Sequence, residues 1–119
     1  MYSTLNIAKY IVNEYIKKDT PITRIQLQDI LYTLQSRYIK AFGHPLFPYA
    51  FEMNKNGPYI PDIYYTFGNY GMMPITHSSM TIVPSLQDKN FIDNILQEIP
   101  VKPCEETEAI FNQTTRKVF

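Results

Sequence analysis

Few side chains in this sequence have the chemistry of a catalytic nucleophile or base. There is one cysteine, Cys104, and there are two histidines, His44 and His77. Cys104 and His77 have the composition of a thiol nucleophile with its base. However, three glutamates close to Cys104 in the sequence oppose the lowered thiol pKa that such a nucleophile needs. The residue types therefore give a cysteine hydrolase little support.

The two histidines are better explained by local structure. His44 follows a predicted helix C-terminus, where an imidazole can approach the last carbonyl groups. His77 lies in an irregular stretch and is expected in an exposed loop. One cysteine and two histidines are too few for a structural zinc site, and residues 68–71 lack the third glycine of a nucleotide-binding loop. The sequence predicts no catalytic residue, no metal and no cofactor.

Three pairs of acidic residues have the composition of a general acid and a general base. The pairs are Glu14 with Asp19, Asp29 with Glu52, and Asp88 with Asp93. Each falls where the pattern predicts a solvated helix face or a helix cap, which favours a structural role. The sequence is therefore interpreted as that of a protein that is not an enzyme.

Length and composition limit the classes of protein to which this chain can belong. The 119 residues fit one domain, and 45% of them are hydrophobic, which is too many for a disordered chain. Eleven basic residues balance eleven acidic ones, which argues against direct nucleic-acid binding. No apolar run has the length of a membrane span, and the first residues lack the features of an export signal, so a cytoplasmic location is expected. The composition is also rich in tyrosine, with ten Tyr and no Trp.

Two helices are predicted in the first 42 residues. The first has apolar residues at helical spacing from Leu5 onward, is capped by Ser3 or Thr4, and ends at residues 19–21. The second begins with a capping box formed by Thr23 and Gln26 and runs to Phe42, with Gly43 as the residue after its end.

The second helix carries two apolar stripes. The wide stripe consists of Leu27, Ile30, Leu31, Leu34, Tyr38, Ala41 and Phe42. The narrow stripe, on the opposite side, consists of Ile25, Tyr32 and Ile39. Three interpretations of the narrow stripe follow: it is buried between neighbouring elements, it binds a partner, or it forms a homodimer.

The remaining elements are shorter. Apolar and polar residues alternate over residues 49–54 as in a half-buried strand, with Met53 on the apolar side, and a turn at Asn56 and Gly57 leads to an edge strand with Pro58. A short helix is predicted from Pro61, a weak strand at residues 80–83, a helix capped near Ser85 or Asp88 and ending at Pro100, and a last helix over residues 105–113. The predicted fold class is α+β and mostly α, a small helical domain with a short antiparallel hairpin or small sheet inserted after the second helix.

Several short segments, in this order, resemble the Panacea domain, a family also described as phage-associated, GepA-like or SocA-like antitoxin proteins. They are residues 25–32 (IQLQDILY), 43–47 (GHPLF), 56–64 (NGPYIPDIY) and 70–71 (YG), followed by Ile75. The resemblance covers roughly residues 6–75. It implies a single domain over residues 1–119, with a divergent and shortened C-terminal part from about residue 76. Asp29 stands where the family commonly has Lys, Ser36 stands where Gly is common, and residues 112–115 lack the family's His.

The resemblance also implies a function. Members of this family are associated with toxin–antitoxin pairs and with phages, and they neutralise toxins by protein contact. We therefore expect a non-catalytic antitoxin-like protein of bacterial or mobile-element origin. The partner-binding candidates are Ile25, Tyr32, Ile39, Tyr59, Tyr64, Tyr65 and Tyr70, with Tyr38 as a further one. The alternative is a phage inhibitor of a host defence nuclease, similar to an anti-CRISPR protein, in which Glu105, Glu106 and Glu108 would mimic phosphates.

Overall fold

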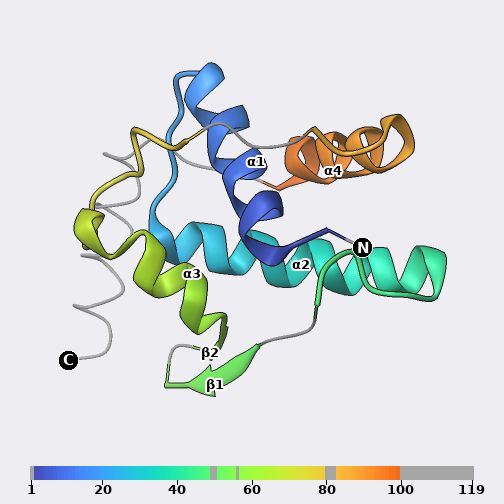
Figure 1. Ribbon diagram of the computed structural model, residues 1–119, viewed down its shortest axis with the longest axis horizontal. Helices are drawn as coiled ribbons and strands as arrows, with labels where there is room; N and C mark the ends of the chain where they lie inside the picture. The colour runs from blue at the N-terminus through green and yellow to red at the C-terminus, as the bar shows by residue number, and fades with distance from the viewer. Residues whose placement is uncertain (1, 49–50, 56, 80–82, 100–119) are drawn as a thin grey trace.

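The computed structural model describes residues 2–48, 51–55, 57–79 and 83–99. In chain order these residues form α1 (Thr4–Lys17), α2 (Arg24–Phe42), β1 (Glu52–Asn54), β2 (Gly57–Tyr59), α3 (Pro61–Thr66), the 3₁₀ turn η1 (Gly68–Tyr70) and α4 (Leu86–Glu98) (Figure 1). The predicted fold class is confirmed: the domain is mostly helical, with a two-stranded antiparallel hairpin after the second helix.

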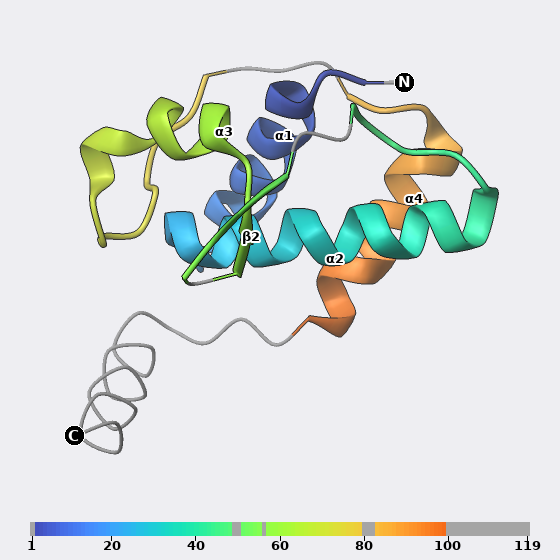
Figure 2. The ribbon, with the colours of Figure 1, turned by 90° about the horizontal axis from the view of Figure 1, so that it is seen from below.

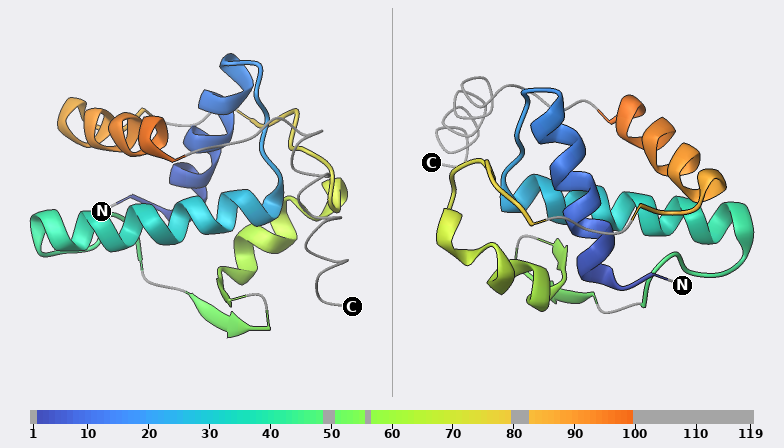
Figure 3. Two further views of the ribbon diagram at one scale, coloured as in Figure 1. Left: turned by 180° about the vertical axis from the view of Figure 1, so that it is seen from behind. Right: turned by 45° about the horizontal axis from the view of Figure 1, so that its top comes forward.

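Helix α2 is the longest element and contacts α1, β2, α3 and α4. Helix α1 crosses over it (Figure 3). The hairpin and α3 lie along the N-terminal half of α2, whereas α4 lies along its C-terminal half (Figure 2). The N-terminal half of α2 is therefore the part where the hairpin, α3 and η1 meet.

The helix ends follow from local hydrogen bonds. The Thr23 side chain accepts a hydrogen bond from the backbone N–H of Gln26, and the Gln26 side chain accepts one from the backbone N–H of Thr23, which is the predicted capping box. Gly43 ends α2 with φ of +80°, a conformation that L-residues with a Cβ rarely adopt. Ser3 and Ser85 cap α1 and α4, as predicted.

The core lies between α1, α2 and the segments that cover them. Leu27, Ile30, Leu31 and Leu34 of the wide stripe are buried, as predicted. They belong to one cluster with Ile7, Ile11, Phe47, Ile63, Ile92 and Leu96, among others. Apolar burial of this kind is the main favourable contribution to folding.

The C-terminal end of the wide stripe departs from the prediction, because Ala41 and Phe42 are exposed. The Phe42 ring still packs on Tyr38 and Phe91, with centroid distances of 4.6 and 5.4 Å. The His44 ring does not cap α2. Its Nδ1 atom lies 3.3 Å from the carbonyl oxygen of Pro45, and the backbone N–H of Gly43 donates to Ile39 instead.

The hairpin is present, but its predicted half-buried face is found only in part: Phe51, just before β1, is half-buried against the core, whereas Met53 is not. Met53 pairs with Pro58 in the antiparallel register and is exposed, because each strand has three residues and nothing described covers that side. Gly57 has φ of +110°, which explains a glycine after the turn. The predicted strand at residues 80–83 falls mostly outside the described residues, and the last helix over residues 105–113 and Cys104 lie entirely outside them.

Two buried glutamines attach the rest of the chain to α2. The Gln28 side chain donates to the carbonyl of Ile60 at 3.0 Å and accepts from its N–H at 2.8 Å. The Gln35 side chain donates to the carbonyl of Phe47 at 2.7 Å and accepts from the N–H of Leu46 at 3.0 Å. Since the two glutamines lie seven residues apart, they share one face of α2 and fix the chain before and after the hairpin.

Tyrosine hydroxyls attach α4 to the other helices. Tyr2 and Tyr38 donate to the two carboxylate oxygens of Asp88, each at 2.8 Å, and Tyr10 donates to Asp93 at 2.8 Å. A part of the tyrosine surplus therefore serves the fold. Within the described ranges, no helix combines the length and the apolar character that a membrane span requires.

Candidate partner-binding surface

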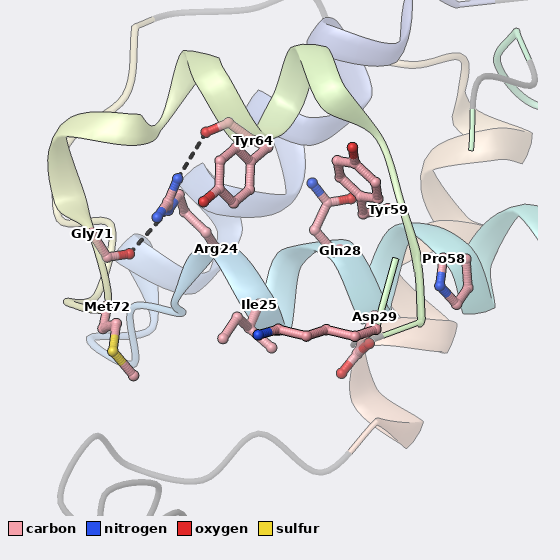
Figure 4. A pocket seen from close by; sticks show the side chains of 10 residues that line it. Arg24, Ile25, Gln28, Asp29, Pro58, Tyr59, Tyr64, Gly71 and Met72 are labelled. Carbon is pink, nitrogen blue, oxygen red and sulfur yellow. Dashed lines mark hydrogen bonds between the residues drawn. The ribbon is translucent and has the colours of Figure 1, made fainter. Parts of the chain in front are cut away.

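An open groove of about 630 Å³ lies between the start of α2, the hairpin and the region of α3 and η1 (Figure 4). Its lining residues are Arg24, Ile25, Gln28, Asp29, Lys55, Pro58, Tyr59, Tyr64, Gly71 and Met72. The groove thus joins residues from three parts of the chain that are up to 48 positions apart, Arg24 to Met72.

Arg24 fixes one wall of this groove. Its Nε donates to the carbonyl of Gly71 at 2.9 Å and its Nη1 donates to the carbonyl of Tyr64 at 3.0 Å (Figure 4). The guanidinium carbon also lies 4.2 Å from the centroid of the Tyr64 ring. Because two of its donors and its planar face are engaged within the chain, Arg24 holds α3 and the residue after η1 against the start of α2.

Three tyrosines form an aromatic wall. The Tyr59 and Tyr64 rings are 6.2 Å apart at 79°, and the Tyr64 and Tyr65 rings are 5.5 Å apart at 90°. Such edge-to-face pairs are favourable arrangements for aromatic rings. Tyr59 is half-buried, Tyr64 is exposed, and Tyr65 is 76% exposed. The exposure of the side chains to solvent therefore increases along the wall from Tyr59 to Tyr65.

Asp29 supplies a carboxylate to the groove. Burial raises its pKa above the ordinary value, although the residue as a whole is exposed. It makes no ion pair with any described residue. The predicted partner Glu52 lies on β1.

Of the predicted partner-binding residues, Ile25, Tyr59 and Tyr64 meet in the groove and Tyr65 lies beside it. Ile25 and Met72 are both exposed at its rim. These positions form one surface, which we call the groove surface and define as Ile25, Tyr59, Tyr64, Tyr65 and Met72.

The other candidates lie elsewhere. Tyr32 and Ile39 are exposed farther along α2, although one side of the Tyr32 ring packs edge-to-face on Phe51 at 5.4 Å. Tyr70 is half-buried against the core, and its hydroxyl donates to the carbonyl of His77 at 2.9 Å. Tyr38 is buried and donates to Asp88, so it is a core residue.

Arg24 and Met72 are part of the groove but were not predicted. Arg24 donates to backbone carbonyl groups. Every residue has such a group, so the residue types do not indicate this contact. Met72 sits in a stretch without periodicity, and its position depends on η1 and on Gly71, whose φ is +57°. The remaining acidic pairs have structural roles: Asp88 and Asp93 accept hydrogen bonds from tyrosines, and Glu14 pairs with Lys17 at 2.9 Å. His77 is exposed in a loop, as predicted.

Comparison with known proteins gives one family match. The family model described as "Antitoxin SocA-like, Panacea domain" matches residues 27–117, which is more than half of the chain. Neither the search of curated proteins nor the search of solved structures finds a match. The matched range includes both buried glutamines, the hairpin, α3 and α4.

Proposed function

Because the chain belongs to the SocA-like antitoxin family with a Panacea domain, we propose that it neutralises a toxin protein by direct, non-catalytic contact through the groove surface. The observation that supports this proposal is the cluster of exposed apolar side chains around the groove. Monomeric soluble proteins rarely expose large contiguous apolar patches unless these patches bind something.

The chemistry of the groove surface suits a protein partner. Tyrosine and methionine are enriched in the centres of protein interfaces, and buried aromatic anchors carry much of the binding energy. Burying apolar surface contributes about 25 cal/mol per Å². Tyr64 and Tyr65 contact each other, and Arg24 holds Tyr64, so these anchors lose little conformational freedom on binding.

Balanced charge supports recognition by shape. The formal net charge is zero, so long-range electrostatic steering is weak and the contact depends on short-range packing. We place the protein in the cytoplasm of a bacterium or of a phage-infected bacterium, where an antitoxin meets its toxin. In the alternative, an inhibitor of a defence nuclease, Glu105, Glu106 and Glu108 would mimic phosphates, and these residues lie outside the described ones.

A growth assay tests the proposal. The protein encoded by the neighbouring gene is expressed from an inducible promoter in a bacterial host, alone and together with this chain, and colony formation is counted. We expect growth arrest by the neighbour alone and recovery when the wild-type chain is present.

Matched variants locate the contact. Tyr65→Asp and Met72→Asp place a charge on the groove surface and should abolish recovery, whereas Leu86→Asp should preserve it, since Leu86 on α4 is 74% exposed and lies outside the groove. Recovery by both groove variants, at equal protein levels, would contradict the assignment of this surface.

A further inference from the structure

Arg24 brings an uncompensated positive charge to the wall of the groove. Its side chain is half-buried, and its described hydrogen bonds go to two neutral carbonyl groups, those of Gly71 and Tyr64. It forms no ion pair with any described residue. A charge that is taken out of water is costly unless it is paired with an opposite charge. An anionic group at this end of the groove would therefore stabilise a guanidinium that has already lost part of its hydration.

Further hydrogen-bond donors lie beside this guanidinium (Figure 4). The Tyr64 ring centroid is 4.2 Å from the guanidinium carbon of Arg24, and the Tyr59 and Tyr64 ring centroids are 6.2 Å apart. Neither phenol hydroxyl has a hydrogen-bond partner in the part of the chain that the structure describes. Lys55, which also lines the groove, adds an ammonium group. The polar groups that the groove offers to a partner are thus mainly donors.

Two carboxylates near the groove do not balance this charge. Asp29 is a lining residue, and Glu52 lies opposite Tyr59 in the hairpin register. Both are exposed, and neither forms an ion pair with Arg24 or Lys55. Because water and salt screen an exposed charge, the two carboxylates contribute less to the local potential than the half-buried guanidinium does. Charge complementarity therefore favours an anionic group in the groove, although the formal net charge of the chain is zero.

We propose that the groove receives an acidic side chain of its protein partner, an Asp or Glu that is flanked by apolar residues. The carboxylate accepts hydrogen bonds from Arg24 and from the Tyr64 hydroxyl, and Lys55 adds attraction. The flanking residues pack on Ile25 and Met72, which are exposed at the rim of the groove and come from two different elements of the chain. The inference rests on the proposed function, since it takes this partner to be the toxin.

Short blocked peptides test this chemistry without the toxin. The probes are acetyl-Leu-Glu-Leu-amide, its analogues with Gln or Lys in the middle, and acetyl-Leu-Gln-Leu with a free C-terminal carboxylate. Each peptide is titrated to millimolar concentration into the isotope-labelled full-length chain, and the dissociation constant is determined from NMR shift changes. We expect the Glu peptide to bind about tenfold tighter than the Gln peptide or more, with shift changes at the Arg24 Nε–H, and the Lys peptide to bind most weakly.

Conservative variants locate the carboxylate in the groove. Tyr64→Phe removes one hydroxyl and keeps the ring, and Lys55→Gln removes one charge. Each should weaken binding of the Glu peptide by about threefold or more and leave binding of the Gln peptide unchanged. The matched controls, Tyr32→Phe and Lys40→Gln, change exposed residues outside the groove and should affect neither peptide.

Several results would overturn the proposal: equal binding of the Glu and Gln peptides, tightest binding of the Lys or the free-carboxylate peptide, no shift change in the groove with any peptide, or groove variants that behave like the controls. If the growth assay described above succeeds and the Glu peptide is not preferred, this proposal fails and the proposed function stands. If the Glu peptide is preferred and growth is not restored, the proposed function fails instead.

Discussion

Gln28 and Gln35 attach the chain on both sides of the hairpin to α2. Each is a buried polar side chain whose donor and acceptor are both used on backbone groups. A buried backbone N–H or carbonyl that loses its partner costs about 1–3 kcal/mol. The glutamines therefore specify where the chain enters and leaves the hairpin, and thereby where the groove forms.

Replacing Gln35 should show how much its hydrogen bonds contribute to the stability of the fold. Gln35→Leu replaces the amide by an apolar side chain of similar size and leaves backbone groups of Leu46 and Phe47 unpaired, so we expect the free energy of unfolding to fall by about 3 kcal/mol. Urea denaturation measures it. The control is Gln97→Leu at an exposed position of α4, which should change stability by less than about 0.5 kcal/mol. Equal effects of the two substitutions would refute a special role for Gln35.

Buried tyrosines predict a loss of stability in alkali. Burial raises the pKa of Tyr15 to about 12, and burial together with the hydrogen bond to Asp88 raises that of Tyr38 to about 12, against 10.0 for an unperturbed tyrosine. The pKa of Tyr10 is raised as well, first by burial and then by Asp93. Between pH 10 and 12 the unfolded chain releases these protons while the folded chain keeps them. Stability is therefore complete below pH 10 and falls as the pH rises through this range.

Phenylalanine substitutions separate the contributions of Tyr15 and Tyr38 to the loss of stability in alkali. Each such tyrosine adds a slope of about 1.4 kcal/mol per pH unit to the loss, so Tyr15→Phe and Tyr38→Phe should both flatten the decline of unfolding free energy between about pH 10 and 11. At neutral pH, Tyr38→Phe should cost about 2 kcal/mol because Asp88 loses a donor, while Tyr15→Phe should cost little, since no described group bonds its hydroxyl. An unchanged alkaline slope in both variants would contradict this account.

At the scale of elements, α4 is held by two carboxylates as well as by its apolar face. Asp88 accepts from Tyr2 and Tyr38, which come from the start of the chain and from α2. Ile92, Ile95 and Leu96 supply the buried side of the helix. The docking of α4 thus depends strongly on one residue in its first turn.

Asp88→Ala should loosen α4 selectively. We expect amide hydrogen exchange in α4 to accelerate by about 30-fold or more, corresponding to about 2 kcal/mol, with a smaller change in the central turns of α2. Gln87→Ala, at the neighbouring exposed position, is the matched control. Uniform acceleration over the whole domain would show that α4 does not open on its own.

The elements were largely predictable because their ends are encoded locally. The capping box of Thr23 and Gln26, the Ser85 cap and Gly43 each act within a few residues, and each prediction is confirmed. The packing partners could not be predicted from local patterns, since Tyr38 and Asp88 are 50 positions apart. Tyrosine also occurs both in cores and at interfaces. The part of Arg24 in the groove was not predicted for the same reason, since Arg24 acts through the carbonyl groups of Tyr64 and Gly71.

At the scale of the whole molecule, balanced charge predicts a weak dependence of toxin binding on salt. The formal net charge is zero and the groove surface is mostly apolar. We expect the dissociation constant to change by less than about threefold between about 50 and 500 mM NaCl. Isothermal titration calorimetry at several salt concentrations measures this. A steep loss of affinity with salt would instead indicate charge-driven recognition of the kind used by phosphate mimics.

Direct contact between the groove surface and a toxin is the central proposal for this protein. The most direct measurement is the affinity of the purified full-length chain for the protein encoded by the neighbouring gene, compared for wild type, Tyr65→Asp and Leu86→Asp. We predict a stoichiometric complex for wild type and Leu86→Asp, and a loss of affinity of about 30-fold or more for Tyr65→Asp, as expected for an aromatic anchor. Equal affinity of the three proteins, or no complex with the wild-type chain, would contradict it.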